Sequence, residues 1–146
     1  MTLQAAARER PSYTIDHQIG FLLRQASQKH ATLFAAHMIE SLTPTQFAVL
    51  AKLQEVGPLS QNHLGRQTAM DAATIKGVVD RLVLRGFVAG QPDPQDARRL
   101  VIGLTPEGQD VVARATPLAE AVADRMLAPL TAGDRQILLR LLRQMI

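Results

Sequence analysis

The chain has no cysteine, which excludes disulfide bonds, thiol redox sensing and thiolate metal sites. Aromatic residues are scarce, with four Phe, one Tyr and no Trp, so aliphatic side chains must build the core. No segment reaches the roughly 18 apolar residues of a membrane span. The charged N-terminus lacks the apolar stretch of a signal peptide, and residues 1–12 are expected to form a frayed arm. These absences favour a cytoplasmic protein.

The composition is that of a folded protein. Of the 146 residues, 47% are hydrophobic and 20% are charged, which fits one compact domain. The net charge of +3 is compatible with binding to nucleic acid, but a basic enzyme would show the same balance. The organisation of the chain therefore has to decide between these function classes.

Apolar residues recur with helical spacing in six segments. We expect helices over about 16–39, 44–56, 60–68, 71–85, 105–127 and 131–145. Residues with N-cap chemistry stand at most of their starts: Thr43, Ser60, Asp71, Thr105 and Thr131. Thr43 and Gln46 have the spacing of a capping box, and Gly86 suits the left-handed position that follows a helix. These start and stop signals support the helix assignments.

The first predicted helix is long for so small a protein. Its apolar stripe, within which His30 and His37 also fall, consists of Ile19, Leu22, Leu23, Ala26, Leu33 and Phe34. A stripe of this length exceeds what one small domain needs. We therefore expect this helix to pack against something besides its own domain.

The periodicity then changes from that of a helix to that of a strand. Residues 87–89 begin a strand, a turn cluster follows at 91–96, and Leu100, Ile102 and Leu104 alternate with their neighbours. Two short helices followed by a hairpin form a winged helix-turn-helix. Its second helix fits the major groove of B-DNA, and its hairpin can place an arginine in a minor groove.

In this arrangement the chain resembles the MarR family of regulators over nearly its whole length. The residues that carry the resemblance are Thr43–Leu53, Asp80-Arg81-Leu82, Arg85-Gly86-Phe87-Val88, the wing signature D-x-R-x5-L-T formed by Asp96, Arg98, Leu104 and Thr105, the following Gly108, and Gly20-Phe21-Leu22-Leu23-Arg24. The ordered combination is specific, whereas each piece alone is a common pattern.

The resemblance implies a mainly α-helical protein of six helices with a small β-wing, working as a homodimer. It places the winged helix-turn-helix at about 44–105 and the dimerisation helices at 13–42 and 106–146. It also implies a repressor without a cofactor, which binds a pseudo-palindromic operator in double-stranded DNA and releases it when a small ligand binds.

On this basis we assign DNA contacts to both short helices and to the wing. The assigned residues are Ser60, Gln61 and Asn62 for phosphates, and Ala72, Ala73, Thr74 and Lys76 for bases or phosphates. Arg98 is the wing residue for the minor groove, and Asp96 orients the wing by pairing with Arg98 or with Arg81. Asp71 is interpreted as a helix cap, because a carboxylate would repel phosphate.

Two features of the second short helix leave alternatives open. Arg81 and Arg85 are solvated charges if they have no partner. Gly77 stands where many family members carry a longer, often basic, residue, and it weakens the helix by roughly 1 kcal/mol relative to alanine. It either permits a close approach to DNA or removes one phosphate contact.

The histidines lack the compact spacing of a metal site. His30 and His37 lie two turns apart, and His17 and Arg24 lie on another face of the same predicted helix. The resemblance suggests that these four residues contact a small aromatic or anionic ligand. The alternative, that the histidines are satisfied core or interface residues, stays open.

Two other function classes remain as alternatives. An enzyme would need a nucleophile motif, a phosphate-binding loop or paired carboxylates, and the sequence offers none of these patterns. A helical protein-interaction module or anti-repressor would keep the helices without touching DNA. A specific, salt-dependent gel shift would separate such a module from a DNA-binding regulator.

Overall fold

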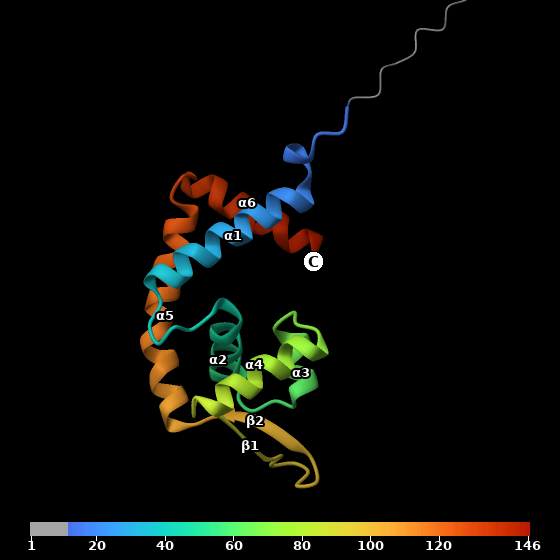
Figure 1. The fold of residues 1–146 in the computed structure, drawn as a ribbon, viewed down its shortest axis with the longest axis vertical. Helices are drawn as coiled ribbons and strands as arrows, with labels where there is room; N and C mark the ends of the chain where they lie inside the picture. Colours follow the sequence, from blue (N-terminus) through green and yellow to red (C-terminus); the bar gives the residue numbers. More distant parts are fainter. Residues whose placement is uncertain (1–11) are drawn as a thin grey trace, which may run out of the picture.

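The computed structural model describes residues 12–146 and is mainly α-helical, with one small β-hairpin (Figure 1). In chain order the elements are the 3₁₀ turn η1 (Ile15–His17), α1 (Ile19–His37), α2 (Pro44–Val56), α3 (Gln61–Gln67), α4 (Ala72–Leu84), β1 (Val88–Pro92), β2 (Leu100–Leu104), α5 (Pro106–Leu127) and α6 (Ala132–Met145). This order confirms the predicted fold class. The predicted N-terminal arm lies outside the described residues, apart from Ser12.

The elements form two groups that α5 connects. α2, α3, α4 and the hairpin gather at one end, which we call the winged lobe (Figure 1). α1 and α6 lie at the other end, which we call the helical arm. α5 runs along one side of the molecule between these ends and packs against both α1 and α2.

Side-chain caps begin the helices where the sequence predicted them. The oxygen acceptors belong to Thr43, Ser60, Asp71, Thr105 and Thr131, and each accepts a hydrogen bond from the backbone N–H three residues later. The capping box at α2 is complete, because the Thr43 N–H donates to Gln46 Oε1 at 3.2 Å and the Gln46 N–H donates to the Thr43 hydroxyl at 3.2 Å.

The end of α4 is a Schellman motif that redirects the chain into the wing. Gly86 has a φ of 77°, which is the left-handed conformation predicted for it. The Phe87 N–H donates to the Leu82 carbonyl at 3.0 Å, and the Gly86 N–H donates to the Val83 carbonyl at 3.0 Å. Phe87 is thereby placed directly before strand β1.

The first helix is shorter than the predicted span of 16–39. Gln18 has an extended backbone, with φ −90° and ψ 137°, and separates η1 from α1. The helix ends at His37 because Met38 is extended, and Glu40 and Ser41 then adopt positive φ values of 57° and 51°. This reversal of the chain direction leads into α2.

The winged lobe has one continuous core, to which the first half of α5 contributes. Leu50 of α2, Leu64 of α3, Ile75 and Leu82 of α4 and Val88 of β1 are almost fully buried in it. The residues of α5 in the same cluster are Val111, Val112 and Ala115. The hydrophobic core of the winged lobe therefore extends past the boundary predicted at residue 105 and includes part of α5.

The hairpin departs from the predicted alternation. β1 and β2 pair antiparallel, with Val88 opposite Leu104, and Leu59 adds two backbone hydrogen bonds to Ile102, at 3.1 and 2.7 Å. Val101 and Ile102 are both buried, whereas Leu100 is 65% exposed. Strict alternation fails because the base of the hairpin is covered on both faces, while its outer end reaches past the lobe.

The helical arm exposes apolar side chains. α6 has no buried residue within the chain, although its apolar positions include Ile137, Leu138, Leu141 and Met145. On α1, Ile19, Leu22 and Leu23 are exposed and only Phe34 is buried. These faces agree with the prediction that α1 packs against something besides its own domain.

Two helical glycines should respond in opposite ways to the same substitution. A Cβ at Gly108 would lie 1.9 Å from the Phe87 carbonyl oxygen, so Gly108→Ala must displace backbone and should lower the free energy of unfolding by about 1–3 kcal/mol. A Cβ at Gly77 would meet only Arg81 Nη1, at 3.8 Å, so Gly77→Ala should raise it by about 0.5–1 kcal/mol.

Urea unfolding of both variants without DNA measures these changes. Equal effects of the two substitutions would show that the contact between Gly108 and Phe87 is unimportant for stability.

Candidate nucleic-acid interface

α4 presents one face to the core and the opposite face to solvent. Ile75, Val78, Val79 and Leu82 are buried, and these positions define the inner face. The residues assigned to DNA contact at its start, Ala72, Ala73, Thr74 and Lys76, are all exposed. Gly77 lies among them on the outer face and is partly exposed. The first half of α4 is therefore accessible to a ligand as large as DNA.

Asp71 behaves as the predicted cap. Its Oδ1 accepts a hydrogen bond of 2.7 Å from the Thr74 N–H, and this bond is the main reason that the pKa of Asp71 lies below its usual range. Lys76, two residues beyond Thr74, donates to the Asp80 carboxylate at 2.7 Å on the helix surface. The cation is thereby held one turn from the start of the outer face.

On the wing, Asp96 holds Arg98 from two sides. The Arg98 Nε and backbone N–H both donate to Asp96 Oδ1 at 3.1 Å, and Arg98 Nη2 lies 3.4 Å from Oδ2. These bonds lower the pKa of Asp96, with the Arg98 side chain as the largest cause. The Arg98 side chain is nevertheless 91% exposed. Asp96 therefore holds the Arg98 side chain in place, as expected if it orients the wing arginine.

Arg81 does not share this role. Within residues 12–146 it forms no ion pair, and its guanidinium lies beside Gly77 on α4. The second partner of Asp96 is Arg99, whose Nε lies 3.9 Å from Oδ2. The predicted pairing of Asp96 with Arg81 is therefore wrong, because residues of the wing loop itself satisfy the carboxylate.

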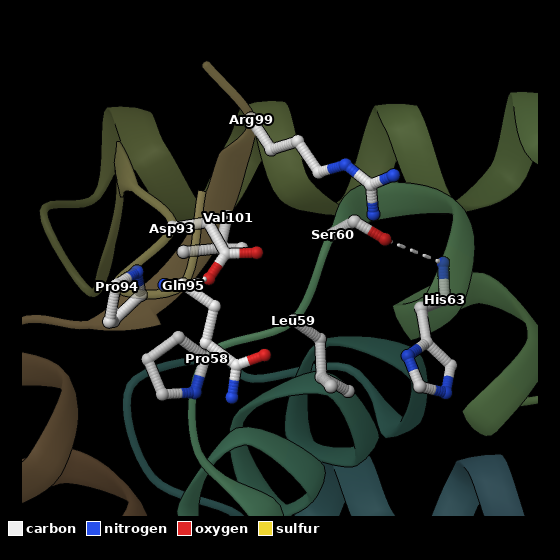
Figure 2. A pocket seen from close by; sticks show the side chains of 9 residues that line it. All are labelled: Pro58, Leu59, Ser60, His63, Asp93, Pro94, Gln95, Arg99 and Val101. Atoms are coloured by element: carbon white, nitrogen blue, oxygen red, sulfur yellow. Dashed lines mark hydrogen bonds between the residues drawn. The ribbon is translucent and has the colours of Figure 1, made fainter. Parts of the chain in front are cut away.

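A cleft of about 380 Å³ separates the wing from the start of α3 (Figure 2). Ser60 and His63 line it from the side of α3, and Arg99, Asp93 and Gln95 line it from the side of the wing. Figure 2 shows the Arg99 side chain reaching across toward Ser60. Gln61 and Asn62 lie on the first turn of α3, directly after Ser60.

Arg99 is a residue that the sequence reasoning missed. The signal was present, because Arg98 and Arg99 are adjacent at the edge of a predicted strand, where neighbouring side chains point to opposite sides. One arginine of such a pair faces outward at the wing tip, and the other can face the body of the lobe.

Arg85 is not a solvated charge. Its guanidinium lies 4.8 Å from the centre of the Phe87 ring, and Nη1 lies 3.5 Å from Gln46 Oε1. Nη2 donates to the Glu40 carbonyl and lies 3.8 Å from the Glu40 carboxylate. Arg85 thus connects the end of α4 to the junction between α1 and α2.

The residues proposed for a ligand are only partly gathered. His30 and His37 are half-buried on α1, and the His30 ring lies 5.7 Å from that of Phe34. Arg24 is exposed, and His17 belongs to η1 instead of α1, so these two do not share a helix as predicted. Within residues 12–146, no three potential metal ligands cluster.

An apolar pocket of about 360 Å³ lies beside these histidines. Its lining comes from the second half of α1 and the junction to α2: Ala31, Phe34, Ala35, Met38, Ser41, Leu42, Thr43 and Pro44. None of the four predicted ligand residues lines it directly, although His30 contacts it through Phe34.

No helix in the described part of the chain is long and apolar enough to cross a membrane.

Comparison with known proteins identifies the family. The MarR family model matches residues 42–100. A relative matched over nearly its full length agrees: the chain is 38% identical to the HTH-type transcriptional repressor NicR of Pseudomonas putida, over 99% of this chain and 92% of that protein. The chain belongs to the MarR family.

Solved structures of MarR-family proteins share the fold. A probable transcriptional regulator from Pseudomonas aeruginosa is 48% identical, with a TM-score of 0.87 over 91% of this chain and all of that one. BpsR of Bordetella bronchiseptica is 36% identical, with a TM-score of 0.85 over 92% of this chain and 96% of that one. The DNA binding of BpsR is regulated by 6-hydroxynicotinic acid. This MarR-family chain is a DNA-binding transcriptional regulator that acts as a homodimer.

The cap at α4 gives a pH-dependent prediction. Because folding lowers the pKa of Asp71, its stabilising effect is present above the unfolded pKa of about 3.9 and is lost as the pH falls through the lower folded value. Asp71→Ala should therefore lower the melting temperature by about 3 °C at pH 7. That difference should shrink below pH 4.

Asp71→Asn is the matched control, since an amide oxygen also caps a helix. It should melt close to the wild type at pH 7 and above it below pH 4, because the amide cap does not titrate. A constant difference between Asp71→Ala and the wild type from pH 7 down to pH 3 would contradict the role of the carboxylate as a cap.

Proposed function

We propose that the dimer represses transcription by binding a pseudo-palindromic operator with its two winged lobes. The two copies of α4 would enter successive major grooves, with half-site centres roughly 10 base pairs apart. The exposed outer face of α4 is the observation that carries this proposal, because it is free for contact in the single chain. A dimer bound to a promoter would exclude polymerase without further contacts. We also propose that the protein acts in the cytoplasm, where the operator DNA lies.

The proposed DNA contacts divide by chemistry. Ser60, Gln61 and Asn62 have hydroxyl and amide groups for phosphates, and Arg99 adds a charge on the other side of the same cleft. Ala73 and the methyl of Thr74 suit a thymine methyl, whereas Lys76 suits a base acceptor or a phosphate. Ala72 stands beside them on the first turn of α4, and Arg98 serves the minor groove.

For the effector, we propose a small aromatic carboxylate that binds at the junction of α1 and α2. The pocket there is lined mainly by apolar side chains, including Phe34 and Met38, and these suit an aromatic ring. His30 lies beside Phe34 and could donate an N–H to the carboxylate. The regulation of BpsR by 6-hydroxynicotinic acid supports this chemical class.

The two rival classes have less support. We infer no catalytic role, because the family consists of transcriptional regulators. An interaction module without DNA contact would not explain an exposed α4 flanked by a wing with two arginines.

Substitution of the two wing arginines should change DNA binding in different ways. Arg99→Gln removes one phosphate contact from each protomer, so it should weaken binding to operator and unrelated duplex equally. It should also reduce the slope of log K against log[salt] by about 2. Arg98→Gln should instead reduce the preference for operator over unrelated DNA.

Fluorescence anisotropy over a salt series measures both effects. Arg125→Gln, which removes a charge from α5 outside the winged lobe, is the control and should leave the slope unchanged. An unaltered slope in Arg99→Gln would remove Arg99 from the interface, and a wild type with no specific salt-dependent binding would refute operator recognition.

The histidines provide the test of the effector site. His30→Ala and His37→Ala should leave operator affinity unchanged while abolishing release by 6-hydroxynicotinic acid. In the wild type this acid should raise the free energy of unfolding by about 2.7 kcal/mol at 100 times its dissociation constant. Lys29→Ala, which changes an exposed residue of α1 next to His30, is the control for induction. Normal induction in either α1 variant would remove that histidine from the effector site.

A further inference from the structure

The junction between α1 and α2 has an unusual backbone. Glu40 and Ser41 are consecutive non-glycine residues in the left-handed region, with φ values of 57° and 51°. Such a conformation persists only where surrounding contacts hold it. The contacts that hold Glu40 and Ser41 therefore show which helices the junction between α1 and α2 is connected to.

Glu40 is held by two helices that are distant in sequence. Its carboxylate lies 3.8 Å from Arg85 Nη2 at the end of α4 and 3.7 Å from Arg114 Nη2 on α5. Its backbone carbonyl also accepts a hydrogen bond from Arg85 Nη2. Arg85 therefore grips both the side chain and the main chain of the same junction residue.

On its other side, Arg85 is fixed to the segment that leads into the wing. The guanidinium rests over the Phe87 ring, and Gly86 between them is the left-handed residue that ends α4. The Gly86 carbonyl accepts from the Thr105 hydroxyl, and the Phe87 carbonyl accepts from the Thr105 N–H at 3.0 Å. A shift of Glu40 would consequently act on the end of α4 and on the start of the wing together.

The junction also forms one wall of the apolar pocket. Ser41, Leu42 and Thr43 line that pocket opposite Phe34 and Met38. A ligand in the pocket would touch the residue next to Glu40 without touching α4. Packed elements of this kind change between discrete arrangements, so a small change at one end can be carried to the other.

We propose that Glu40 and Arg85 are positioning residues that couple the pocket to α4, the helix proposed to enter the major groove. The occupied pocket favours a different backbone at Ser41, which withdraws Glu40 from Arg85 and frees the last turn of α4 to move against the helical arm. This inference rests on the effector pocket proposed above and adds the route by which its occupancy reaches DNA.

Glu40→Gln tests the link first without any ligand. Loss of a partly exposed ion pair should make the Gly86 and Phe87 amides exchange about 2- to 5-fold faster with D₂O. The matched control is Asp110→Asn. It removes the other carboxylate beside Arg114, at 3.0 Å, with the same change of charge, and should leave the exchange of both amides unchanged.

The second arm measures coupling with 6-hydroxynicotinic acid as the probe. In Glu40→Gln the acid should bind the free dimer as it binds the wild type, while its effect on the operator dissociation constant should fall at least about 5-fold. Arg85→Gln should lose the same coupling, and the double variant should lose no more than either single one. The acid should release the Asp110→Asn variant from the operator as it releases the wild type.

The two measurements distinguish a failure of the proposed link between Glu40 and Arg85 from a failure of the proposed effector. Unchanged exchange in Glu40→Gln, or wild-type release by the acid, would overturn the link. If the acid does not bind the wild type, the proposed effector is wrong, and the exchange arm still decides whether Glu40 holds the end of α4.

Discussion

The orientation of the winged lobe depends on the packing of α5 against the carbonyl of Phe87. Gly108, on the first turn of α5, lies so close to this carbonyl that no side chain fits between them. From there Val111 and Val112 enter the core of the lobe, and the same helix continues to Val122, which is buried far from the lobe. One continuous helix therefore fixes the wing and α4 relative to the helical arm. This constraint explains why a contact at the end of α4 can depend on α1.

Most of the charges on the surface proposed to face DNA belong to ion pairs, and the excess of positive charge there is small. Lys76 is held by Asp80 and Arg98 by Asp96, and both cations remain largely exposed. Ion pairs of this kind contribute little to stability, so on the proposed interface a DNA phosphate would replace the carboxylate at small cost. Without DNA, the pairs keep each cation in place and reduce attraction to arbitrary duplex. The low net charge of +3 is consistent with a surface that relies on correctly placed contacts.

The sequence predicted what is decided locally. The caps at Thr43, Asp71 and Thr105 were correct because a cap needs only a side-chain oxygen and an N–H three residues later. The errors concern partners distant in sequence. Arg85 could not be paired with Glu40 before the fold brought residues 45 positions apart together, and the burial of Ile102 depends on Leu59, which pairs with it from the segment before α3. The break at Gln18 has no signal in the pattern, which continues helically through it.

The exposed arm links folding to DNA recognition. A 14-residue helix such as α6, with no buried residue of its own, is marginal in water and needs a packing partner. We propose that the second copy of the homodimer supplies that partner for α6 and for the apolar stripe of α1. Because these helices adjoin α5, such an association would also set the distance between the two copies of α4. On this proposal, dimerisation, stability of the arm and the spacing of the half-sites are parts of one equilibrium, and a ligand that changes one of them would change the others.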